Sequence, residues 1–172
     1  MRIAIIIDPA LSFPVDEQGN TISVEGAAEP AAQHPALRSL LANLSGAGSP
    51  FSTFSCKTWS AQEEGDTAAC IFASAVGIIF QHEADNSAMK SFIGVAHRLA
   101  GLLHTEAEFL SAEILICRAV FSEERSSYCL QLTLSAKGST ASQAQMRWGL
   151  GLAHVQQALL FVARELLRES GA

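Results

Sequence analysis

The chain has few charged residues. Asp, Glu, Lys and Arg make up 16% of its 172 residues, and 49% of the residues are hydrophobic. An average soluble domain has about a quarter charged residues. Because large apolar patches on a protein surface usually mark interfaces, we expect a homo-oligomer or a protein that binds another protein.

Clusters of basic residues are also missing. Lys and Arg total 11 and are scattered, Asp and Glu total 17, and the formal net charge is -6. Binding to nucleic acid and to anionic membranes both depend on clustered Lys and Arg. We therefore expect neither a nucleic-acid partner nor a membrane partner.

Long apolar runs are absent too. The longest uncharged apolar stretch, residues 67–81, has 15 residues, and a membrane-spanning helix needs about 20. The apolar start of the chain is too short for a secretory signal, and no small-residue cleavage site follows it. These features predict a cytoplasmic protein.

The cysteines do not form a recognisable motif. No two are close enough for a CxxC pair, and each lies in an apolar or strand-like segment: Cys56, Cys70, Cys117 and Cys129. Free cysteine in such segments behaves as a small hydrophobic residue. We expect reduced thiols, without a disulfide framework or a zinc site.

Familiar catalytic motifs are missing as well. The sequence contains no GxSxG, HExxH, GxGxxG or phosphate-loop pattern. Whether the protein is an enzyme therefore stays open at this stage, and no cofactor is indicated.

Histidines and carboxylates provide the main candidates for catalysis. His82 and Glu83 follow an apolar run, and a carboxylate beside a histidine can orient it as a general base. His97 or His104 could complete such a site. These two are seven residues apart, about 10.5 Å along a helix, which is too far for both to bind one metal ion from one helix. We predict no metal site.

Two further positions could bind a ligand. Asp8 ends an apolar strand, a position that faces the ligand crevice in parallel α/β sheets and simply meets solvent in antiparallel ones. Lys137 and Ser139 join a strand to the start of a helix, where backbone N–H groups can hold an anion. For Lys137 and Ser139, the alternative is an ordinary turn with hydroxyl caps.

Hydrophobic periodicity predicts the secondary structure. Pro9 should end the first strand, and Asn86 or Ser87 should cap the second helix. Residues 67–81 fit either a buried helix or a strand, with Gly77 as a possible division. The remaining expected strands are residues 2–8, 51–60, 112–121 and 127–136, with a small hairpin at 14–25. The strands at 112–121 and 127–136 should form an antiparallel hairpin, and alternation in 51–60 should place Phe54 on the same side as Cys56 and Thr58. The expected helices are 35–45, 86–103 and 140–170.

The C-terminal helix is the longest expected element. An apolar seam follows one side of it at spacings of three and four, through Trp148, Leu152, Val155, Leu159, Val162 and Leu166. Gly149 and Gly151 each cost roughly 1 kcal/mol relative to alanine, so we expect either that another backbone lies close to them or that the main helix begins only after them. Ser142 and Gln145 fit a capping box, with Ser139 or Thr140 as earlier starts.

This order of elements favours a single α+β domain over residues 1–172. Its sheet should be mostly antiparallel, with helices packed on one face, and a parallel α/β fold is the lesser alternative. The leading functional hypothesis is a non-catalytic interaction or assembly domain, chaperone-like and self-associating. The alternative is a small-molecule enzyme or binder, with a pocket between the sheet and the helices that uses Asp8, His82, Glu83, His97 or His104.

Overall fold

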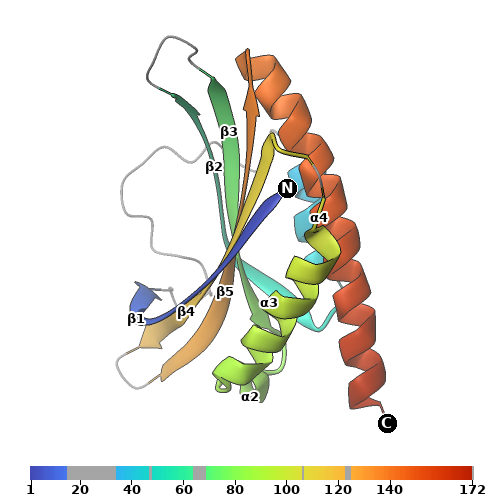
Figure 1. The fold of residues 1–172 in the computed structure, drawn as a ribbon. Helices are drawn as coiled ribbons and strands as arrows, with labels where there is room; N and C mark the ends of the chain where they lie inside the picture. The colour runs from blue at the N-terminus through green and yellow to red at the C-terminus, as the bar shows by residue number, and fades with distance from the viewer. Residues whose placement is uncertain (15–33, 47, 64–68, 106, 123–124, 172) are drawn as a thin grey trace.

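A computed structural model describes residues 1–14, 34–46, 48–63, 69–105, 107–122 and 125–171. Apart from its first residue, Pro14, the small hairpin expected at 14–25 lies outside this part of the chain. The described residues fold into one sheet with its helices on one face, as the sequence predicted (Figure 1).

The sheet is five-stranded and mixed, in the order β1-β4-β5-β3-β2. Its strands are β1 (Arg2–Pro14), β2 (Phe51–Gln62), β3 (Cys70–Phe80), β4 (Leu110–Ser122) and β5 (Arg125–Gly138). β4 and β5 form the expected antiparallel hairpin, and β5–β3 and β3–β2 are also antiparallel. The pairing of β1 with β4 is parallel, so the sheet is mostly antiparallel without being purely so.

The helices cover one face of this sheet. They are α1 (Pro35–Leu44), the short α2 (Glu83–Asn86), α3 (Met89–Leu103) and α4 (Ala141–Ser170). α4 packs on β5 and β3, α3 lies beside it towards β1, and α1 lies on its other side near β2 (Figure 1). The main hydrophobic core fills the space between the helices and the sheet.

β1 does not end at Pro9, contrary to the prediction. Its pairing with β4 runs to Ile7, shifts register, and resumes from Ser12 to Pro14. Asp8 closes the intervening bulge, since its Oδ1 accepts hydrogen bonds from the backbone N–H groups of Ala10 and Leu11 at 3.1 and 3.2 Å. Proline is tolerated there because β1 is an edge strand whose bulge needs no ladder donor at that residue.

Residues 70–80 form a strand, so this part of the ambiguous stretch 67–81 is not a helix; residues 67 and 68 lie outside the described part of the chain. Gly77 lies inside this strand instead of dividing it. A Cβ atom at Gly77 would lie 2.6 Å from the Phe54 ring and 2.4 Å from Ser55 Oγ. The glycine therefore makes room for side chains of β2 on the face of the sheet opposite the described helices, here called the helix-free face.

A register shift in β2 accounts for the place of Phe54. The alternation of the sequence put Phe54 on the same side as Cys56 and Thr58. The pairing of β2 with β3 shifts between Thr53 and Ser55, and Phe54 packs in a second small cluster with Cys117, Ala119 and Cys129. Phe54 therefore lies on the helix-free face, because a bulge reverses the side to which a strand residue points.

Asn86 does not cap α3. Its side chain is buried, and it accepts a hydrogen bond from Phe80 N at 2.7 Å and donates one to Phe80 O at 2.8 Å. The N-cap of α3 is Ala88, without a side-chain hydrogen bond. Asn86 instead pairs both backbone groups at the end of β3, where the sheet would otherwise leave them buried and unsatisfied.

α4 is held to the sheet along the predicted seam. Trp148 is almost fully buried, and its indole Nε1 donates a hydrogen bond to Ser74 Oγ at 3.0 Å. Its ring makes an edge contact with Phe72 at 4.8 Å between ring centroids. The other seam residues are buried or packed against the core: Leu152, Val155, Leu159, Val162 and Leu166.

α4 begins two residues before the predicted capping box. Thr140 is the N-cap, and its Oγ1 accepts a hydrogen bond from Gln143 N at 3.2 Å. The Gln143 side chain reaches back and accepts from Ser139 N at 2.7 Å. The helix therefore starts at Thr140, one of the earlier starts that the sequence allowed, and Gln143 bonds the backbone N–H of the residue before the cap instead of the N–H of the cap itself.

Close approaches explain two of the glycines around the start of α4. A Cβ atom at Gly138 would lie 2.5 Å from the backbone nitrogen of Ala144, and one at Gly151 would lie 2.9 Å from Leu110 Cδ2. A Cβ atom at Gly149 would have no atom within 4 Å. At Gly151 the helix comes close to leucine side chains of the sheet, and not to another backbone as expected.

Candidate functional site

The histidines predicted for catalysis lie on the surface. His82 follows the end of β3, His97 is on α3, and His104 follows the last residue of α3; all three side chains are exposed. Glu83 begins α2, and its side chain lies outside the described part of the chain. No hydrogen bond or ion pair joins any two of these histidines among the described residues, so a catalytic role for them stays a prediction.

The residues predicted to bind ligands have structural partners. Asp8 holds the β1 bulge. Lys137 forms an ion pair with Glu63, and its carbonyl oxygen accepts a hydrogen bond from Arg147 at 2.7 Å. Ser139 donates to the Gln143 side chain from both its backbone N–H and its hydroxyl, so the N–H group expected to hold an anion is already bound.

Lys137 and His82 lie near opposite ends of the sheet. Lys137 pairs with Ile71 at the start of β3, and His82 comes after that strand has ended. Strand residues rise about 3.3 Å each, so roughly 30 Å separates the two positions. A single small-molecule pocket does not span this distance.

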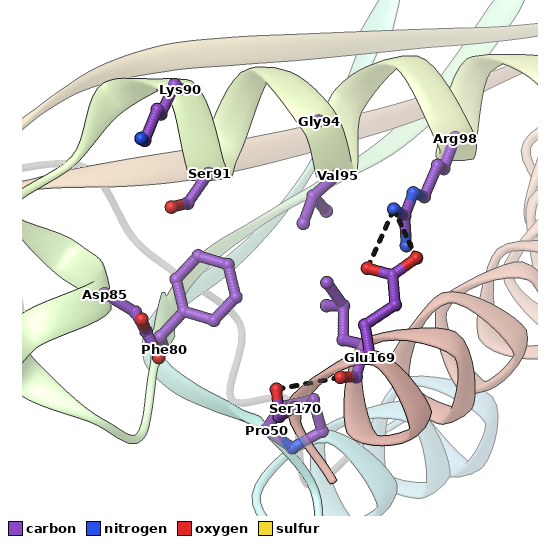
Figure 2. Close-up of a pocket in the computed structure, with 11 residues that line it drawn as sticks. Pro50, Phe80, Asp85, Lys90, Ser91, Gly94, Val95, Arg98, Glu169 and Ser170 are labelled. Carbon is purple, nitrogen blue, oxygen red and sulfur yellow. Dashed lines mark hydrogen bonds and ion pairs between the residues drawn. The ribbon is translucent and has the colours of Figure 1, made fainter. Parts of the chain in front are cut away.

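The described surface has a pocket between α3 and the end of α4 (Figure 2). It has a volume of about 360 Å³ and is open to solvent. Phe80 and Val95 supply apolar surface, while Lys90 and Arg98 project from α3. None of the seven residues predicted for a site lines it; its lining consists of Pro50, Phe80, Asp85, Lys90, Ser91, Gly94, Val95, Arg98, Leu166, Glu169 and Ser170.

The charges of this pocket are partly neutralised. Arg98 on α3 donates two hydrogen bonds to the Glu169 carboxylate on α4, at 2.8 and 3.0 Å (Figure 2). Both side chains are largely exposed, so the pair contributes little to stability. Asp85 and Lys90 line the other part of the pocket, and no nucleophile–base pair lies among the lining residues.

The outer side of α4 is the most apolar exposed surface of a described helix. Met146, Leu150 and Phe161 are exposed to 61%, 63% and 52%. With Ala153 and Gln157, also exposed, they follow one another at spacings of four, three, four and four residues. These five residues, here called the outer stripe, face away from the buried seam of the same helix.

Charges are missing from the middle of α4. Residues 148–163 contain no Asp, Glu, Lys or Arg, although the helix lies on the surface of the described domain (Figure 1). The outer face of a surface helix normally carries charged and polar residues. A helix that is apolar on both sides is typical of one that packs against two partners, and the sheet is the first of these.

The sequence contained a signal for the outer stripe. The charge-free run of sixteen residues is visible in the sequence. Leu160 and Leu167 form a second apolar strip beside the seam, on the flank that faces α1. Leu160 is half-buried there, and both residues line a small pocket beside α1. Absence of charge on the face opposite the seam was the more informative feature.

Comparisons with models of known protein families, with curated proteins and with solved structures gave no significant match to this chain. Among the described residues, no three His, Cys, Asp or Glu side chains are grouped to hold a metal ion. No helix formed by these residues has both the length and the apolar content that crossing a membrane requires.

Proposed function

We propose that this protein is a non-catalytic, cytoplasmic interaction domain that self-associates through the outer stripe of α4, in the manner of a small assembly or chaperone-like domain. The observation that carries the proposal is the exposed outer stripe of α4, none of whose five residues is charged. Burial of such a surface is favourable in proportion to its apolar area.

A second copy of the chain is the occupant that the stripe fits, in an antiparallel arrangement. A two-fold axis between residues 153 and 154 places Met146 opposite Phe161 of the second copy and Leu150 opposite Gln157. The small side chain of Ala153 at the centre lets the two helices approach closely. Such an isologous contact needs only one surface, presented by both copies.

Charge also favours the antiparallel arrangement. Arg164 and Arg168 lie on the outer side of α4, beyond the stripe. In a parallel pair each arginine would face its own counterpart, which is repulsive. In the antiparallel pair they face Gln143 and Ser139 of the second copy, and the opposed helix dipoles add a small favourable contribution.

The exposed area is of the right order for a modest dimer. The exposed fractions of Met146, Leu150 and Phe161 amount to roughly 350 Å² per copy, compared with about 800 Å² per partner in a standard interface. Flanking residues on α4 would supply the rest. We therefore expect a reversible dimer that forms at high protein concentration, and not an obligate one.

Light scattering after size exclusion tests the proposal directly. The wild-type chain should approach twice the monomer mass of 18.2 kDa as its concentration rises. Leu150→Lys should remove about 120 Å² of apolar burial from each copy and add a charge, so at about 25 cal/mol per Å² the dimer affinity should fall at least ~100-fold. Circular dichroism should show that the variant is still folded, because Leu150 is exposed.

A matched control comes from α3. Leu102 is 37% exposed on α3 and lies outside the stripe, so Leu102→Lys should leave the dimer affinity unchanged. A wild-type chain that stays monomeric at every concentration would refute the proposal. Equal loss of association in both variants would show that any exposed leucine matters and that the stripe does not define the interface.

A further inference from the structure

The β4–β5 hairpin brings two cysteines together. Cys117 and Cys129 are directly opposite in the register of the two strands, and their Sγ atoms are 3.5 Å apart. Both residues are fully buried, in the small cluster with Phe54 and Ala119 on the helix-free face of the sheet. The other two cysteines have no cysteine opposite them: Cys56 pairs with Val76, and Cys70 with Gly138 and Gln62.

The two thiols have different acidities. The pKa of Cys117 is lowered, chiefly because the Cys129 thiol donates a hydrogen bond to it, although burial and the Asp8 carboxylate oppose this. The pKa of Cys129 is raised, because it loses that hydrogen bond when it ionises and because it is buried. Cys117 therefore becomes a thiolate first, and the thiolate is the form that attacks an oxidant.

We propose that Cys117 and Cys129 are a redox modification site, which forms a reversible cross-strand disulfide on reaction with a hydroperoxide. Side chains directly opposite in an antiparallel pair have Cβ atoms about 4.5–5.5 Å apart. A disulfide needs about 3.5–4.5 Å. The two ranges meet, so the bond forms with a displacement of about 1 Å or less.

The reaction balances with hydrogen peroxide as the oxidant. The Cys117 thiolate attacks one peroxide oxygen, the O–O bond breaks, and hydroxide leaves, which produces a sulfenic acid on Cys117. The Cys129 sulfur, losing its proton, then attacks the Cys117 sulfur and expels the sulfenic oxygen as hydroxide, which takes up a proton. Two thiols and one peroxide give one disulfide and two waters. A dithiol reductant reverses the change.

Peptide mapping of the full-length protein tests this inference. Trypsin cleaves after Arg98, Arg118, Arg125 and Lys137 and so places Cys117 on residues 99–118 and Cys129 on residues 126–137. After peroxide treatment of the folded protein, we expect these two peptides to run as one linked species that dithiothreitol separates. The intact mass should fall by about 2 Da, the loss of two hydrogens.

Two variants make the outcome specific. After peroxide treatment, the double variant with Cys56→Ala and Cys70→Ala should still lose two hydrogens. The variant Cys129→Ala should instead gain oxygen on Cys117. The protein with the disulfide should also have an unfolding temperature on the order of 5 °C above that of the reduced protein. Three outcomes would overturn the inference. In the folded wild-type protein, Cys117 could accumulate oxygen beside an intact Cys129, disulfides could join other cysteines, or the thiols could stay reduced.

Discussion

Replacing Gly149 and Gly151 by alanine, one at a time, should have different effects on the free energy of unfolding, although the two residues are only two positions apart in α4. A Cβ atom at Gly149 would have no atom within 4 Å, whereas one at Gly151 would meet Leu110 Cδ2 at 2.9 Å and Leu134 Cδ2 at 3.1 Å. Both substitutions gain the same helix propensity, so the difference between them measures the packing of α4 on the sheet.

The magnitudes follow from these contacts. Gly149→Ala should stabilise the protein by about 1 kcal/mol, the usual advantage of alanine over glycine within a helix. Gly151→Ala gains the same amount and loses about 1–3 kcal/mol through overpacking, since both leucines are themselves buried. Its net effect should lie between roughly zero and 2 kcal/mol of destabilisation, so the two variants should differ by about 1–3 kcal/mol.

Urea unfolding followed by circular dichroism measures both values, at one protein concentration so that self-association does not shift the midpoints. Gly94→Ala on α3 is the control, because a Cβ atom there also has nothing within 4 Å. It should stabilise as Gly149→Ala does. If Gly151→Ala proves as stabilising as these two, α4 does not approach the sheet as closely as described.

Two further predictions concern single side chains. Asn86→Ala removes both hydrogen bonds to the Phe80 backbone and leaves two buried groups without partners, so it should lower the free energy of unfolding in urea by about 2–4 kcal/mol. Asn43→Ala, at an exposed site, should lower it by less than about 0.5 kcal/mol. Equal losses in the two variants would contradict the role of Asn86. Burial raises the pKa of Cys56 from 9.0 to about 11, so its alkylation rate in a variant with no other cysteine should reach half its maximum near pH 11. Because the unfolded thiol ionises at lower pH than the folded one, the contribution of Cys56 to stability should be complete below pH 9 and decline between pH 9 and 11; a half-maximal rate near pH 9 would contradict this.

Local patterns in the sequence predicted most of the elements, and their order predicted that the helices pack on one face of the sheet. The seam of α4 and the hairpin of β4 and β5 each contain enough regular residues for their period to be clear. Residues 67–81 did not, because a strand buried on both faces has no alternation and resembles a buried helix in composition. The antiparallel partners of β3 on both sides decide its structure, and pairing is not visible in one segment alone.

Bulges explain the remaining differences. Phe54 lies on the helix-free face because the β2 register shifts beside it, and β1 continues past Pro9 because Asp8 closes a bulge there. The pairing of Cys117 with Cys129 has the same origin. A five-residue turn over 122–126 would have placed Gln131 opposite Cys117, but the strands extend to Ser122 and Arg125 with a further shift.

The candidate site and the buried seam lie on opposite sides of the same helix, α4. The seam of α4 was visible because apolar residues recur in it, and the outer stripe was overlooked because its signal is a lack of charge. The predicted histidines are the converse case. Their chemistry is visible in the sequence, but the described residues provide no contact that brings His82, His97 and His104 together, so their catalytic role stays a prediction.

The parallel pairing of β1 with β4 has a consequence for the order in which the chain folds. Arg2 lies opposite Ser111, so β1 leaves the ribosome more than a hundred residues before the strand with which it pairs. At about 5–20 residues per second this takes roughly 5–20 s. During that time Ile3, Ile5, Ile6 and Ile7 have no strand of the sheet to pair with, which leaves β1 exposed to misassembly until β4 has been made.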